Sequence, residues 1–118
     1  MHPQHRLTQS RDYAELKARG TAFRGRFCLL VVCPCGEQLT RVGFVASKRG
    51  VGNSVQRNRA RRRLREIVRR RWDRVPTLGS MLMFVAFRSV LVAPHQDLAS
   101  DVERVLSLAG VLSPVEVA

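Results

Sequence analysis

The sequence has few acidic residues, few aromatic residues and no long apolar run. Only nine Asp and Glu residues oppose 21 Lys and Arg residues, so the formal net charge is +12. No apolar run approaches the roughly 20 residues that span a bilayer, which excludes a membrane-spanning helix. Residues 1–26 contain no apolar core of the kind found in secretory signal peptides. The number of cysteines, three, is odd, which argues against a disulfide framework. We therefore expect a cytoplasmic protein.

The sequence also lacks any arrangement of residues that performs covalent chemistry. It has no paired carboxylates, no Ser–His–Asp arrangement and no defensible Cys–His pair. Cys33 and Cys35 lack both the two-residue spacer and the second ligand pair of a zinc site. The three histidines have no companion cluster. We expect a binding module that has no metal site and no catalytic residue of its own.

The most informative segment is the run of residues 57–74, RNRARRRLREIVRRRWDR. It contains ten arginines, which only Glu66 and Asp73 offset. Apolar residues recur at helical spacing inside it, so we predict a helix over residues 57–74 with one buried stripe and a broad basic face opposite. The predicted stripe consists of Ala60, Leu64, Ile67 and Val68.

A helix that carries so much positive charge indicates a polyanionic partner. Arginine outnumbers lysine, since Lys17 and Lys48 are the only lysines, and its planar fork suits phosphate and base contacts. Ordinary solvated helices interleave acids at i,i+4 spacing, and membrane-surface helices need an exposed apolar face. The sequence shows no helix-turn-helix, no zinc finger and no aromatic RNA-recognition strand. These features favour structured RNA, recognised by shape and phosphate contacts.

The whole chain, residues 1–118, has the pattern of one α+β domain. Residues 1–7 and 113–118 are expected to be loose ends. We predict that strands 27–33 and 41–47 form a hairpin about a turn at 34–36, and that the arginine helix crosses over between strands 41–47 and 81–87 of a mixed sheet. The other predicted elements are a helix over 8–19, capped by Thr8 or Ser10 and ended by Gly20, a short strand at 20–24, a basic loop over 48–54, and a last helix after Pro94.

One run of residues resembles a known family. The run RVGFVASKR (41–49), the loop GVGNSVQ (50–56) and the helix start RNRARRRLR (57–65) are similar to the protein subunit of bacterial ribonuclease P. That family has a strand ending in Ser-Lys-Lys or similar, a short loop, and a helix beginning Arg-Asn-Arg. The segment RLTQSRDY (6–13) also resembles the opening helix of the family, and the resemblance covers nearly the whole chain.

The resemblance implies a fold and a function. The implied fold is a small two-layer αβββαβα sandwich with an unusual left-handed βαβ crossover. The implied function is to assist a catalytic RNA, which holds the Mg²⁺ ions, in removing the 5′ leader of precursor tRNA. The implied partners are this RNA and precursor tRNA, with no membrane and no small-molecule substrate. Charge alone does not separate this function from that of a structural RNA-binding protein, such as a small ribosomal protein or an RNA chaperone.

The resemblance also implies roles for individual residues. Tyr13 stands where the family usually carries Phe, and Lys17 stands where a second aromatic often follows, so leader binding here is expected to depend more on charge and less on stacking. The residues implied for leader binding are Tyr13, Lys17, Leu29 and Val31. Those implied for contact with the catalytic RNA are Lys48, Arg49, Arg57, Asn58, Arg59, Arg62, Arg63 and Arg65.

Overall fold

The computed structural model describes residues 1–113, and the predicted loose end at 113–118 lies outside the described residues except for Ser113. The helices and strands follow the αβββαβα order that the sequence predicts. They are α1 (Ser10–Arg19), β1 (Thr21–Arg24), β2 (Cys28–Leu39), β3 (Arg41–Val45), α2 (Ser54–Arg69), β4 (Leu78–Ala86) and α3 (His95–Leu108), with the short 3-10 helices η1 (Pro3–His5), η2 (Trp72–Arg74) and η3 (Arg88–Leu91).

The four strands form one mixed sheet in the order β1-β2-β4-β3. β1 and β4 each pair antiparallel with β2, and β3 pairs parallel with β4. The predicted hairpin between strands 27–33 and 41–47 is therefore wrong, because β4 lies between them. Residues 81–84 of β4 are all buried, as expected of a strand covered on both faces. Because both faces of β4 are apolar and must leave water, β4 lies inside the sheet and not at its edge.

β2 is longer than predicted. The expected turn at residues 34–36 is wrong, because β2 continues to Leu39. The register against β4 shifts between Pro34 and Leu39, and such an irregularity tolerates a proline that cannot donate a ladder hydrogen bond. Gly36 adopts a φ of 64° within the same stretch. The chain turns instead at Thr40, between β2 and β3.

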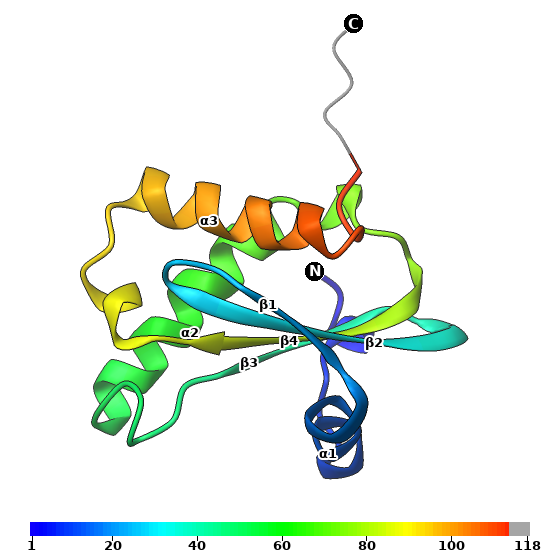
Figure 1. Ribbon diagram of the computed structural model, residues 1–118, viewed down its shortest axis with the longest axis horizontal. Helices are drawn as coiled ribbons and strands as arrows, with labels where there is room; N and C mark the ends of the chain where they lie inside the picture. The colour runs from blue at the N-terminus through cyan, green and yellow to red at the C-terminus, as the bar shows by residue number, and fades with distance from the viewer. Residues whose placement is uncertain (114–118) are drawn as a thin grey trace, which may run out of the picture.

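Helices cover both faces of the sheet (Figure 1). α2 and α3 lie on one face above the larger apolar cluster, and α1 lies on the other face above a smaller one. The expected two layers are therefore extended by a third, partial layer that α1 forms. Leu16 of α1 is fully buried in the smaller cluster, which also contains Val31, Cys33, Met81 and Met83.

The N-terminal segment is packed, contrary to the expected loose end at residues 1–7. The Leu7 N–H donates to the Val42 carbonyl at 2.9 Å, and His5 Nδ1 lies 2.6 Å from the Thr40 carbonyl oxygen. Both His5 and Leu7 are buried. Neither Thr8 nor Ser10 caps α1, because Gln9 occupies the cap position without a side-chain hydrogen bond. The helix does end at Gly20 as predicted.

α2 begins at Ser54, three residues before the predicted start at Arg57, because a capping box precedes it. The Asn53 side chain accepts from the Gln56 N–H at 2.9 Å, and Gln56 Oε1 accepts from the Asn53 N–H at 3.0 Å. The helix ends at Arg69, and residues 72–74 form η2 instead of a last turn of α2. The predicted stripe is confirmed, since Ala60, Leu64, Ile67 and Val68 are all buried. No helix within residues 1–113 is long and apolar enough to cross a membrane.

α3 is tied to the sheet by a buried carboxylate. Asp101 accepts from the Arg26 N–H at 2.8 Å and from the Phe27 N–H at 2.9 Å, in the connection between β1 and β2. Asp101 is 5% exposed, so water could not take the place of its carboxylate as the acceptor for these two backbone N–H groups. The side chain therefore joins segments 74 residues apart in the chain.

Replacement of Asp101 by alanine tests this tie. Asp101→Ala leaves two backbone N–H groups without their charged acceptor, so the free energy of unfolding should fall by about 3 kcal/mol. Asp97→Ala, an exposed acid in the first turn of the same helix, should cost less than about 1 kcal/mol. Urea unfolding followed by circular dichroism measures both, and equal losses would contradict the structural role of Asp101.

Candidate nucleic-acid interface

The arginines at the C-terminal end of α2 and beyond it are neutralised by acids. Glu66 lies 2.7 Å from Arg69 Nη2 and 3.2 Å from Arg70 Nε. Hydrogen bonds from Arg69 and Arg70 lower the pKa of the Glu66 carboxyl to about 2, so it stays ionised at neutral pH. Glu103 of α3 accepts in the same way from Arg71 at 2.7 Å and Arg74 at 3.2 Å. This end of the basic segment is committed to contacts within the protein.

The N-terminal part of α2, residues 54–65, has no such compensation. Within residues 1–113, Arg57, Arg59, Arg62 and Arg65 form no ion pair with a carboxylate. The last three are exposed, and Arg57 is half-buried. The helix dipole adds positive potential at the same end. The strongest unpaired positive charge of α2 therefore lies between residues 54 and 65.

Further polar groups extend this surface. Lys48 and Arg49 are exposed in the loop before α2, which is closed by a 2.8 Å hydrogen bond from the Gly50 N–H to Ser47 Oγ. Val51 is fully buried and anchors the loop. Asn58, exposed on the outer side of the helix, accepts a hydrogen bond from the Arg61 guanidinium.

Arg63 differs from its neighbours. Its Nη1 donates to the Val90 carbonyl at 2.5 Å and its Nη2 donates to the Ala93 carbonyl at 2.7 Å. The structure therefore turns Arg63 toward η3 and the start of α3, away from the outer surface. The family resemblance implied Arg63 as a contact with RNA, and only the tertiary structure reveals the carbonyls that bind its side chain.

An open apolar row lies on the α1 face of the sheet. The strand register places Leu29 opposite Val85 and Val85 opposite Val45. All three side chains are half-buried and pack at the edge of the cluster under α1, whereas Val31, one row further along β2, is buried. The family resemblance points to Leu29 alone, and only the strand register joins Val45 and Val85 to it.

Tyr13 of α1 stands over β3 beside this row. A Cβ atom at position 43 would overlap the Tyr13 ring and hydroxyl, so the glycine there permits the approach. The Tyr13 hydroxyl donates to the Leu7 carbonyl at 3.0 Å, and the ring is half-buried. Lys17, one turn further along α1, is exposed and does not belong to the apolar cluster.

Arg65 connects the two surfaces. Its guanidinium lies 5.6 Å from the centroid of the Phe44 ring on β3, and it lines a hollow of about 110 Å³ together with Tyr13. Burial raises the pKa of the Tyr13 phenol, and the positive charge of Arg65 opposes that rise. The basic face of α2 and the α1 side of the sheet therefore meet around the edge strand β3.

Metal-binding clusters are missing from the described part of the chain. Within residues 1–113, no three His, Cys, Asp or Glu side chains gather as ligands. Cys33 is buried under α1, and burial raises the pKa of its thiol. A magnesium site needs several oxygen ligands, and the described residues bring no such group of carboxylates together.

Comparison with known proteins agrees with this geometry. A family model described as Ribonuclease P matches residues 1–110. The ribonuclease P protein component of Chloroflexus aurantiacus is 35% identical over 108 residues, which cover 92% of this chain and 79% of the relative. That of Symbiobacterium thermophilum is 35% identical over 109 residues, which cover 92% and 93%.

Solved structures show the same fold. The RNase P protein of Staphylococcus aureus matches with a TM-score of 0.77 at 21% identity, covering 92% of this chain and 98% of that one. The RNase P protein from Thermotoga maritima matches with a TM-score of 0.76 at 20% identity, covering 87% and 96%. The family model and the sequence relatives go further than the fold: this chain belongs to the family of bacterial ribonuclease P protein components, the protein part of the ribonuclease P endonuclease.

Proposed function

We propose that this chain binds the catalytic RNA of ribonuclease P through the N-terminal part of α2, residues 54–65. We also propose that it binds the 5′ leader of precursor tRNA along the α1 side of the sheet, and so assists removal of the leader. The observation that carries the proposal is the division of charge along α2. Acids neutralise the C-terminal arginines, while those at residues 54–65 have no carboxylate partner within the described residues.

The catalytic RNA contacts follow the exposed basic groups at one end of the molecule. Each arginine that neutralises a phosphate releases condensed counterions, which makes the affinity steeply dependent on salt. Arg63 contributes indirectly, by holding η3 and the start of α3 against α2. The residues proposed for direct contact are Lys48, Arg49, Arg57, Asn58, Arg59, Arg62 and Arg65.

The leader would lie along the apolar row of the sheet beside α1. Tyr13 offers one ring face to a base, Leu29 offers part of the apolar floor, and exposed Lys17 offers charge to a phosphate. Val31 is buried and supports the floor from beneath α1. Arg65, beside Tyr13, stands where the leader and the catalytic RNA would approach each other.

Assistance of this kind needs no catalytic group in the protein. Contacts with the leader exist in the precursor and are lost in the mature tRNA, so they add binding energy that favours substrate over product. The arginines reduce repulsion between two RNA backbones. The proposal assigns Mg²⁺ to the RNA. The left-handed sense of the β3–α2–β4 crossover stays a prediction from the family resemblance, and a cytoplasmic location stays a prediction from the sequence.

A structural RNA-binding protein, such as a small ribosomal protein or an RNA chaperone, is the alternative. The half-buried apolar row beside Tyr13 favours the proposed function. A protein that binds folded RNA by charge alone does not require an apolar row on the surface of its sheet. Affinity for precursor tRNA that grows with leader length distinguishes the two.

The location of charge along α2 is tested by two double variants of equal net charge. Arg59→Ala/Arg62→Ala should weaken binding to a bacterial ribonuclease P RNA by about a hundredfold and reduce the log–log salt slope by about 2. Arg69→Ala/Arg70→Ala removes the same charge from residues already paired with Glu66, and should change the slope by less than about 1. Filter binding over a range of salt concentrations measures both, and equal slopes would show that only total charge matters.

The stacking role of Tyr13 is tested with and without a leader. Tyr13→Ala should weaken binding of precursor tRNA by about tenfold, because base stacking contributes roughly 1–3 kcal/mol per base. Binding of tRNA without a leader should not change. Tyr13→Phe retains the ring and should bind nearly as well as the original chain. An equal loss for both RNAs would instead indicate damage to the fold of α1.

The charge of Lys17 is tested by crosslinking to the leader. Lys17→Ala should reduce crosslinking of precursor tRNA leader to the same degree as Tyr13→Ala, since charge is expected to replace the second aromatic ring. Arg19→Ala, an exposed residue of the same helix whose partner is Glu15, is the matched control and should have a smaller effect. No change in Lys17→Ala would remove this residue from the leader path.

A further inference from the structure

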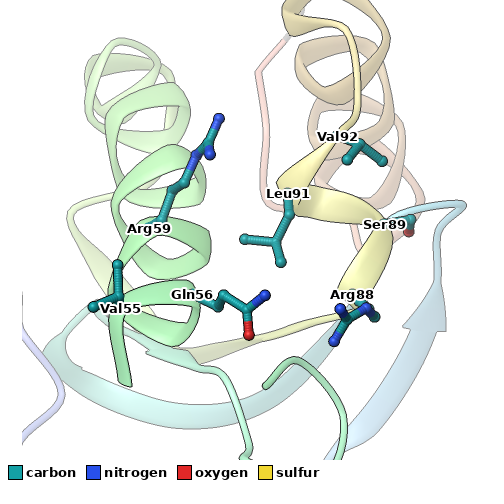
Figure 2. Close-up of a pocket in the computed structure, with 7 residues that line it drawn as sticks. All are labelled: Val55, Gln56, Arg59, Arg88, Ser89, Leu91 and Val92. Carbon is teal, nitrogen blue, oxygen red and sulfur yellow. The ribbon is translucent and has the colours of Figure 1, made fainter. Parts of the chain in front are cut away.

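A groove lies between the first turns of α2 and the η3 segment that follows β4 (Figure 2). Its volume is about 540 Å³, within the range of roughly 300–1,000 Å³ typical of sites for small organic groups. Neither the leader path nor the outer face of α2 accounts for it. The residues that line it are Val55, Gln56, Arg59, Arg88, Ser89, Leu91 and Val92.

The groove exposes apolar side chains that the fold does not use. Val55 is 74% exposed and Val92 is 84% exposed, on opposite sides of the groove, and half-buried Leu91 lies between α2 and Val92 in Figure 2. Apolar surface gathered in a concave site and rimmed by polar groups marks a binding surface. The two walls of the groove are fixed relative to each other, because Arg63 of α2 binds the carbonyls of Val90 and Ala93. These two residues flank Leu91 and Val92 in the chain.

Polar groups at the groove are arranged to bind an anion and a hydrogen-bond acceptor. The Arg88 Nη1 donates to the Val51 carbonyl at 2.8 Å, which fixes the guanidinium and leaves its other nitrogens available. Arg59 extends from α2 on the other side (Figure 2). Gln56 spends its Oε1 on the Asn53 N–H, so its Nε2 donors remain to face an acceptor, and its side chain extends toward η3.

We propose that this groove binds one unpaired nucleotide of the catalytic RNA. The base would pack against Val55, Leu91 and Val92 with an acceptor facing Gln56 Nε2, and its phosphate would lie between Arg59 and Arg88. This inference rests on the proposed function, because Arg59 belongs both to the groove and to the basic face of α2. A base joined to a phosphate matches apolar walls between two arginines, and sequence-specific RNA recognition favours unpaired bases.

Charge argues against a second copy of the chain as the occupant. Each copy carries a net charge of +12, so two basic surfaces would have to meet around Arg59 and Arg88. A nucleotide brings the opposite charge to the same place.

Site-specific crosslinking tests the proposal directly. The photoreactive residue p-azidophenylalanine is placed at Val92 in one variant and at Asn58, on the outer face of α2, in another. Each protein is bound to a bacterial ribonuclease P RNA and irradiated, and the crosslinked nucleotides are mapped by primer extension. The proposal predicts that position 92 crosslinks to one discrete unpaired nucleotide.

The two positions separate the groove from the proposed function. Crosslinks from position 58 without any from position 92, or crosslinks from 92 confined to base-paired nucleotides, would overturn the groove proposal and leave the α2 interface intact. Crosslinks from neither position would overturn the proposed function, and the groove proposal with it.

A neutral double variant provides an independent test. Val55→Ser/Val92→Ser should weaken RNA binding by about tenfold with an unchanged salt slope, because no ionic contact is removed. Leu78→Ser/Leu108→Ser, which alters two other exposed apolar residues, should leave affinity unchanged. Equal effects in the two variants would overturn the proposal. So would a dimer of the original chain, detected by sedimentation, that Val55→Ser/Val92→Ser dissociates.

Discussion

Burial of one apolar stripe of α2 against the sheet is the constraint on which the remaining structure depends. Leu64, Ile67 and Val68 are at most 1% exposed, and each contributes about 1.5–3 kcal/mol by leaving water. Repulsion between neighbouring like charges on a helix costs only about 0.2–0.5 kcal/mol per pair. The stripe therefore outweighs the repulsion, and it presents the arginines of the outer face to solvent in a fixed orientation.

The acids of the chain determine where that charge remains unpaired. Glu66 and Glu103 neutralise arginines at the C-terminal end of the helix and beyond it, where α3 packs nearby. The capped N-terminal end has the loop containing Lys48 and Arg49 in front of it. The edge strand β3 separates this end of α2 from Tyr13, and Arg65 reaches across that edge. One small domain in this way carries a basic surface and an apolar row that meet around one edge strand.

The sequence predicted the elements better than their arrangement. The stripe of α2 is confirmed, because helical spacing is a local property. The hairpin between strands 27–33 and 41–47 is wrong, because strand pairing depends on which strand must be buried on both faces. The turn expected at Pro34 is a register shift within β2, since local turn preference cannot show that the ladder resumes at Leu39.

In the candidate site, too, local sequence patterns identify some residues and only the fold reveals the others. Position along α2 identified the exposed Arg59 and Arg62, whereas the inward bonds of Arg63 depend on carbonyls 27 and 30 residues away. Val45 and Val85 join Leu29 only through the strand register. The groove beside Arg59 needs η3 to be packed against α2, which no local pattern indicates.

Reconstitution of cleavage is the decisive test of the proposed function. The chain is mixed with a bacterial ribonuclease P RNA, and removal of the leader from precursor tRNA is followed at low Mg²⁺ and near-physiological salt. The account predicts correct 5′ cleavage that depends on the protein and is lost when Arg57 and Arg59 are both replaced by alanine. Tight binding of the RNA without any rescue of cleavage would contradict it, and would leave a structural RNA-binding role in its place.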